Sequence, residues 1–169
     1  MTLPSQKGRF VQGHPRALRC GASVLAIAGL GMGAVGCGGG DASGATVTVY
    51  VSAPLCAAAK ADLASHGATA GHFKVVARCL APSERGGGGV DLAANGSNSR
   101  RATEDTRAVA TLEEPGPGNE FAQAILESAG IPLVTSPSGR RGMQQVIKAV
   151  EDAGSSDVRG SVHEAFESS

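Results

Sequence analysis

Short blocks of apolar residues alternate with longer amphipathic blocks along most of this chain. Four of the short blocks are rich in Val, Ile, Leu and Thr, and a proline follows each within three residues, which is typical of buried strands that end at a turn. The predicted strands are 45–51, 73–80, 107–112 and 131–135. The predicted helices lie at 57–65, in the second half of 91–105, at 120–129 and at 143–152.

This alternation of strands and helices predicts an α/β fold, with a parallel open sheet of about four strands and flanking helices. We expect one domain at 45–153, followed by a polar tail at 154–169 that has few apolar residues. Ligands of such sheets bind at the carboxyl ends of the strands. That rule selects three turns as candidate sites. They are residues 52–55, 113–118 and 136–139.

Local patterns within the domain predict which helix sides are buried. The first helix has apolar residues at four-residue spacing, at Leu55, Ala59 and Leu63, and should face the sheet. The third has an apolar side formed by Phe121, Ile125 and Leu126. Arg101 and Asp105 are spaced for an ion pair on a solvent-facing side. Four glycines at 86–89 lack the Gly-Lys-Ser or Gly-Lys-Thr of a phosphate-binding loop, so we expect an ordinary loop.

The N-terminal segment has the pattern of an export signal. Basic residues precede an uncharged, largely apolar stretch at 22–35, and small residues and a cysteine follow it. This stretch is shorter than the roughly 20 apolar residues of a membrane-spanning helix, and it is rich in glycine. We therefore expect a signal peptide at 1–36 and a glycine-rich tether at 37–44.

Ala34-Val35-Gly36-Cys37 resembles a bacterial lipobox, the motif whose cysteine becomes the lipidated first residue of the mature protein. Ala34 stands where the motif usually has leucine, whereas Gly36 and Cys37 fit it. The resemblance implies that lipid chains on Cys37 hold the protein at the extracytoplasmic face of the cell membrane. The alternative is a signal peptide that is cleaved without lipidation.

Two of the four cysteines remain for the folded domain, because Cys20 leaves with the signal peptide and Cys37 is the lipidation candidate. An exported domain experiences oxidising conditions, so we expect Cys56 and Cys79 to form a disulfide bond. The alternative is a pair of separate buried thiols. Neither cysteine belongs to a Cys-x-x-Cys motif, so redox catalysis and zinc binding have little support.

Charge and composition argue against several classes of function. From Cys37 onward the chain has eleven Lys and Arg against fifteen Asp and Glu, a net charge of −4. A nucleic-acid surface would be basic and rich in aromatic residues, whereas only 3% of the residues are aromatic and none is Trp. The sequence has no His paired with a nucleophilic Ser or Cys and no metal-ligand motif, so we expect no catalytic residue, no metal and no cofactor.

The segment 47–138 carries a recognisable order of motifs. It runs VTVYVSAPLC, then FKVVARCL, then a glycine-rich turn, then RRATEDTRAVATLEEPGPGNEFAQAILESAGIPLVTSPS. This order resembles the first lobe of a type 1 periplasmic-binding protein, and more narrowly the substrate-binding lipoproteins of branched-chain amino acid ABC importers. Ala129-Gly130-Ile131-Pro132 and Thr135-Ser136-Pro137-Ser138 fit the family most closely.

The resemblance implies capture of a small amino-acid-like solute for the membrane subunits of an ABC importer. Ser136 and Ser138 would contact its carboxylate or ammonium group, and the loop at Glu114 would line the cleft. Serines in a Ser-Pro-Ser turn are also common turn or cap formers. The family closes two lobes around its solute, whereas this chain has the length of one lobe. Glutamates also stand at 113 and 114, where the family has small residues.

Two functions of different classes follow from these observations. In the first, the chain is a lipid-anchored solute-binding lobe of an importer. In the second, it is a truncated relative that acts as a non-catalytic interaction or structural module of the cell envelope.

Overall fold

The computed structural model describes residues 45–85, 89–154 and 157–168. The chain divides into two units, Met1–Cys37 and Gly38–Ser169, and all the described residues belong to the second unit. The predicted signal peptide, the tether at 37–44 and the lipidation candidate Cys37 therefore lie outside the described residues.

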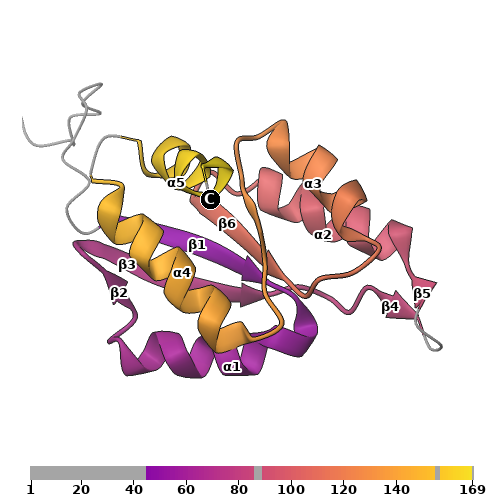
Figure 1. Ribbon diagram of the computed structural model, residues 1–169, viewed down its shortest axis with the longest axis horizontal. Coiled ribbons are helices and arrows are strands. Elements are labelled where there is room, and N and C mark those ends of the chain that lie inside the picture. The colour runs from indigo at the N-terminus through magenta and orange to yellow at the C-terminus, as the bar shows by residue number, and fades with distance from the viewer. Residues whose placement is uncertain (1–44, 86–88, 155–156, 169) are drawn as a thin grey trace, which may run out of the picture. The chain divides into compact units, whose positions relative to one another are not determined.

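A five-stranded sheet forms the centre of the described domain, in the order β2-β3-β1-β6-β7 (Figure 1). Its strands are β1 (Thr46–Val51), β2 (Thr69–Ala70), β3 (Phe73–Cys79), β6 (Ala108–Glu113) and β7 (Leu133–Thr135). Strands β3, β1, β6 and β7 run parallel, and the short edge strand β2 is antiparallel to β3. The predicted α/β fold with about four parallel strands is therefore confirmed, although β2 makes the complete sheet mixed.

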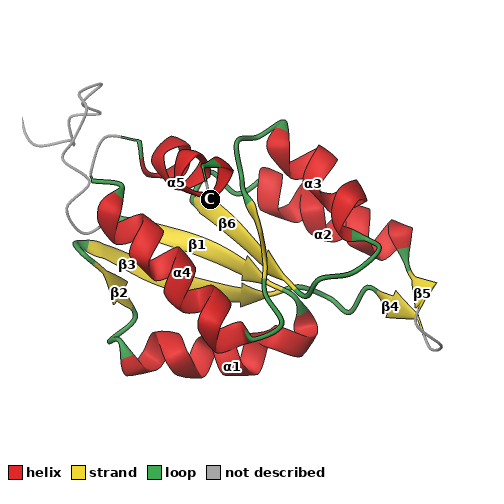
Figure 2. Ribbon diagram, in the orientation of Figure 1, coloured by secondary structure: helices red, strands yellow, loops and turns green. Residues whose placement is uncertain are grey.

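The described helices cover both faces of this sheet (Figure 2). They are α1 (Ala53–Ser65), α2 (Leu92–Thr103), α3 (Asn119–Glu127), α4 (Gly139–Asp152) and α5 (Val158–Glu167). Helices α1, α4 and α5 contribute to one buried hydrophobic cluster, and α2 and α3 contribute to another. The predicted apolar stripe of α1 is confirmed, since Leu55, Ala59 and Leu63 are all buried.

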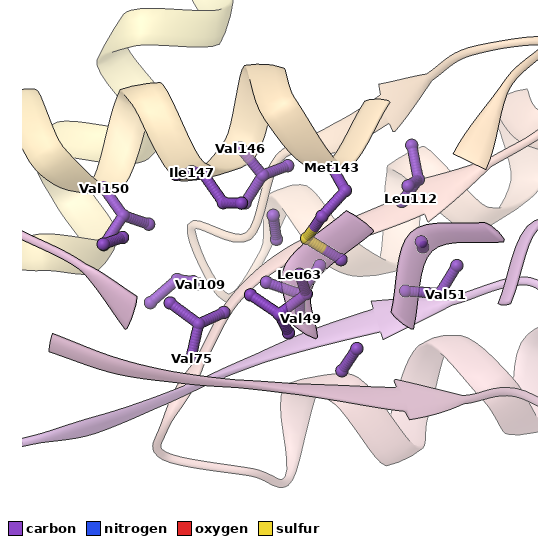
Figure 3. Packing of buried hydrophobic residues seen from close by; sticks show 14 of the residues in the cluster. Val49, Val51, Leu63, Val75, Val109, Leu112, Met143, Val146, Ile147 and Val150 are labelled. Atoms are coloured by element: carbon purple, nitrogen blue, oxygen red, sulfur yellow. The ribbon is translucent and has the colours of Figure 1, made fainter. Parts of the chain in front are cut away.

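The larger hydrophobic cluster lies between the sheet and α4 (Figure 3). Met143, Val146 and Val150 of α4 pack there with Val49 of β1, and each of these four side chains is fully buried. Such close packing requires glycine at position 142, because a β carbon there would collide with the Leu112 side chain of β6. This cluster has more buried apolar residues than the cluster on the α2 and α3 side of the sheet.

The segment predicted as a polar tail at 154–169 is not a tail, and the domain extends beyond residue 153. It contains α5, whose Val158, Val162 and Phe166 recur at four-residue spacing and join the larger cluster. Arg159 fixes the helix to the sheet, because its guanidinium donates to the carbonyl oxygens of Ala108 (2.8 Å) and Asp105 (2.9 Å). The prediction failed because the segment is mostly polar and its large apolar residues recur only at every fourth position of the helix.

The residues around the glycine run form a small hairpin rather than an unstructured loop. Strands β4 (Glu84–Arg85) and β5 (Gly89–Val90) pair in an antiparallel manner. Residues 86–88 between them lie outside the described part of the chain. Helix α2 begins directly after β5, at Leu92, where the Asp91 carboxylate caps the backbone N–H groups of Ala93 and Ala94.

Two side-chain predictions need correction. On α3 the predicted apolar side is right for Leu126, which is fully buried, but not for Phe121, which is 42% exposed and lies against Gly96 of α2; Ala122 joins Leu126 on the buried side. Asp105 lies beyond the end of α2, so it is not placed on a helical face with Arg101. Its carboxylate instead accepts a hydrogen bond from the Tyr50 hydroxyl at 3.1 Å.

A disulfide bond joins Cys56 in the first turns of α1 to Cys79 at the end of β3, with the two Cα atoms 5.6 Å apart. Cys56 is buried and Cys79 is exposed. Helix α1 begins where β1 ends, and β3 ends at the same edge of the sheet, because β1 and β3 are parallel neighbours. The bond therefore restrains the start of α1 relative to the segment that follows β3.

We expect replacement of both cysteines with alanine to lower the free energy of unfolding by about 3 kcal/mol, because the 23-residue separation closes a substantial loop in the unfolded chain. Urea unfolding followed by circular dichroism measures the change. A reducing agent should produce a similar loss in the original chain and none in the double variant. Unfolding of the original chain that is insensitive to reduction would contradict a stabilising disulfide.

Candidate functional site

A crevice of about 540 Å³ opens at the carboxyl ends of β1 and β6. Its described lining consists of segments 52–54, 82–84, 89–90 and 113–119, together with Asn95 of α2. Strands β1 and β6 are neighbours, but the helices that follow them, α1 and α3, pack on opposite faces of the sheet. Such a reversal leaves a gap between the strand ends, which is where ligands of open α/β sheets bind.

Two buried polar atoms of the crevice lining have no hydrogen-bond partner, Ser52 Oγ and Asn95 Oδ1. Ser52 directly follows β1 and occupies the N-cap position of α1, yet its side chain does not cap the helix. Asn95 is only 3% exposed. An unpartnered buried polar group costs about 1–3 kcal/mol, so a hydrogen bond to either atom would stabilise the domain.

The helix that carries Asn95 packs on the sheet through an unusually polar side. The buried residues of α2 are Asn95, Gly96, Asn98, Ser99 and Ala102. Asn98 has a structural role, because its amide group exchanges two hydrogen bonds with the backbone of Ala81, at 2.8 and 3.3 Å. Ser99 is also satisfied, since its hydroxyl donates to the carbonyl oxygen of Asn95. Asn95 Oδ1 is therefore the buried side-chain acceptor of α2 that is left for a ligand.

Two helices begin at the crevice without a side-chain cap. Helix α1 starts after Ser52 and α3 starts after Gly118, and neither N-cap residue makes a side-chain hydrogen bond to the helix. The other described helices are capped by side chains. Their caps are Asp91 for α2, Ser138 for α4 and Asp157 for α5. A helix N-terminus is the positive end of the helix dipole, so α1 and α3 can both favour an anionic ligand group here. Helix α1 has fewer N–H groups to offer, because Pro54 has none and the Leu55 N–H donates to the Ser52 carbonyl oxygen at 3.1 Å.

The loop from β6 to α3 is shaped by its own hydrogen bonds. The Asn119 side-chain amide donates to the carbonyl oxygen of Glu114 at 3.1 Å, and the Asn119 backbone N–H donates to that of Gly116 at 3.1 Å. Gly118 permits α3 to approach α2, because a β carbon there would lie 2.9 Å from Asn95 Nδ2. The loop thus brings the start of α3 and Asn95 to the same side of the crevice.

Carboxylates dominate the charge of the site. Glu84, Glu113 and Glu114 line the crevice, and no Lys, Arg or His is among its described lining residues. Glu113, the last residue of β6, is 9% exposed. Burial raises the pKa of the Glu113 carboxyl above its ordinary value of 4.5, because the charged form loses contact with water. The site therefore favours ligand groups that donate hydrogen bonds or carry positive charge.

Of the three residues predicted to contact a ligand, Glu114 lines the crevice and Ser136 and Ser138 do not. The Ser136 hydroxyl is held within its own turn, where it donates to the carbonyl oxygen of Ser138 at 3.0 Å and accepts from the Ser138 backbone N–H at 3.2 Å. Ser138 caps α4 by accepting from the Arg141 backbone N–H. Both serines act as turn and cap formers, the alternative given by the sequence.

Of the three turns that the strand-end rule selected, those at 52–55 and 113–118 contribute residues to the crevice lining, and the turn at 136–139 does not. Asn95 was missed, because the predicted helix was placed in the second half of 91–105 and interpreted as solvent-facing. A signal was present. Asn95, Asn98, Ser99 and Ala102 have helical spacing, with small and polar residues where a sheet-facing helix usually has apolar ones.

A metal site and a membrane-spanning helix each have structural requirements, and the described residues can be compared with both. Within the described residues, no group of three or more His, Cys, Asp or Glu side chains is placed to hold a metal ion. In the same part of the chain, none of the helices combines the length and the apolar character that crossing a membrane requires.

We expect Glu113→Gln to stabilise the domain at pH 8 and to have little effect at pH 4. Because the folded pKa is raised, the folded state binds more protons than the unfolded state between pH 4.5 and that raised pKa. The contribution of Glu113 to stability is thus fully present below pH 4.5 and is lost as the pH rises through the folded pKa. Urea unfolding at pH 4, 6 and 8 measures this change.

Glu164→Gln is the matched control, since Glu164 is exposed on α5 and outside the crevice. It should change the free energy of unfolding by less than about 0.5 kcal/mol at each pH. If Glu113→Gln were destabilising at pH 8, the buried carboxylate would have a stabilising partner, contrary to this account.

Comparison of the chain with models of protein families, with curated proteins and with solved structures finds no match.

Proposed function

We propose that this chain is a solute-binding lobe that holds a small amino-acid-like molecule at the extracytoplasmic face of the cell membrane and serves the membrane subunits of an ABC importer. The observation that carries the proposal is the crevice at the ends of β1 and β6. There, uncapped helix N-termini and unpartnered polar side chains lie around one cavity.

The two kinds of polar group match the two ends of an amino acid. A ligand carboxylate would accept hydrogen bonds from backbone N–H groups at the start of α3 and from the Ser52 hydroxyl. A ligand ammonium group would donate to Asn95 Oδ1 and to the carboxylate of Glu113 or Glu114. Such a site binds without a chemical step, because it needs neither a nucleophile nor a general base.

The volume of the crevice also suits this class of solute. A cavity of about 540 Å³ lies within the range of roughly 300–1,000 Å³ that small-molecule sites occupy. The expected export signal and the resemblance of segment 47–138 to the first lobe of type 1 periplasmic-binding proteins give the proposal its cellular setting. In that family a second lobe or a partner would close the open side of the crevice.

Titration of the full chain with the common amino acids, followed by isothermal titration calorimetry, tests solute binding. We expect at least one amino acid to bind and Ser52→Ala to weaken its affinity roughly tenfold, because a hydrogen bond to a charged group contributes about 1.5 kcal/mol. Ser128→Ala serves as the control, since Ser128 is exposed at the end of α3 and outside the crevice. Absence of heat with every amino acid would favour the non-binding envelope module.

The proposed membrane anchor is tested separately. We expect mass spectrometry of the membrane fraction to find a mature protein that begins with an acylated Cys37, and Cys37→Ser to move the protein to the soluble fraction. Cys20→Ser should leave the anchor intact, because Cys20 precedes the expected cleavage site. An unmodified mature N-terminus at another residue would contradict lipidation.

A further inference from the structure

The described lining of the crevice has three acidic residues, whereas a neutral amino acid has one cationic group to place beside them. We propose that its solute is a basic amino acid, whose second cationic group binds at the carboxylates of Glu113 and Glu114. This inference rests on the proposed solute-binding function and specifies its substrate class. It differs from the branched-chain amino acids that the family resemblance suggests.

The first support is the charge of the lining. Three acidic residues, Glu84, Glu113 and Glu114, line the crevice, and no basic residue is among its described lining residues. None of these carboxylates forms an ion pair with a described residue. Glu113 is 9% exposed, and a carboxylate that is removed from water to this extent is stabilised when a cation comes to lie beside it. A ligand with net positive charge supplies that cation.

The second support is independent of the carboxylates. Asn95 Oδ1 is a neutral acceptor that is buried on α2, on a different element from the glutamates, and it has no donor. The α-ammonium group of any amino acid has three N–H donors, so it could pair with this amide oxygen and with one carboxylate, and the other acidic residues of the lining would still lack a cation. A second amino or guanidino group on the same ligand supplies that cation.

The third support is the lack of a large apolar subsite. Val90 is the only branched aliphatic side chain among the described lining residues, and prolines, glycines and polar residues form most of the remainder. A branched aliphatic side chain would therefore meet mainly prolines and polar groups, with Val90 as its one branched aliphatic partner among the described lining residues. The uncapped helix N-termini still favour one ligand carboxylate, which distinguishes a basic amino acid from a simple diamine.

Two matched pairs of ligands test this inference by calorimetry on the full chain. Norleucine is lysine without its terminal amino group, and norvaline is ornithine without its own. We expect lysine or ornithine to bind at least tenfold more tightly than its neutral partner. The variant that combines Glu113→Gln with Glu114→Gln should reduce this preference to less than threefold, whereas Glu164→Gln at an exposed position of α5, outside the crevice, should preserve it. Glutamate and 1,5-diaminopentane complete the panel.

The outcomes separate the two proposals. Equal or tighter binding of norleucine, norvaline or glutamate would overturn the basic substrate class and leave solute binding intact. Tighter binding of 1,5-diaminopentane than of lysine would also overturn it, because the carboxylate would then have no site. If no ligand in the panel and no common amino acid bound, both the substrate class and the solute-binding function would be overturned.

Discussion

The site depends on the pairing of β1 along both of its edges. This strand is hydrogen-bonded to β3 on one side and to β6 on the other, and Val47 to Val51 are all buried. The pairing with β6 continues one residue past the strand, because the Ser52 backbone N–H donates to the Leu112 carbonyl oxygen at 2.9 Å. This bond fixes the Ser52 backbone at the edge of the sheet from which α1 and α3 depart to opposite faces. The Ser52 hydroxyl has no protein partner.

The two faces of the sheet differ in how apolar their buried contacts are. On one face, α1, α4 and α5 bury the larger apolar cluster, with α4 in direct contact with β6 at Gly142. On the other, α2 presents mainly small and polar residues to the sheet, and Asn95 lies at the crevice. Apolar burial on the opposite face stabilises the domain, so the fold tolerates a buried polar side chain such as Asn95 on α2.

The polar groups of the crevice have a cost in the unliganded domain. Each buried polar atom without a partner, Ser52 Oγ and Asn95 Oδ1 among them, destabilises the fold by about 1–3 kcal/mol. The Cys56–Cys79 bond offsets part of this cost close to the site, because it joins the start of α1 to the end of β3. A ligand that pairs with these atoms would stabilise the domain further, because it would bind the folded state alone.

The sequence by itself determined the α/β class, the four parallel strands and the helices between them, because hydrophobic periodicity and proline-rich turns are local properties of the chain. It also indicated the turns at 52–55 and 113–118 as parts of a site, since parallel strands place their carboxyl ends at one edge. Only the tertiary structure decided which polar groups have partners. The Ser136 hydroxyl bonds the Ser138 backbone and the Ser138 hydroxyl caps α4. Ser52 Oγ and Asn95 Oδ1 have no partner, although serine and asparagine are equally capable of capping and turn formation. Likewise, α5 belongs to the domain because Val162 and Arg159 find partners on α4 and β6 that are distant in sequence. Hydrogen-bond pairing and burial depend on such distant neighbours, and no local pattern specifies them.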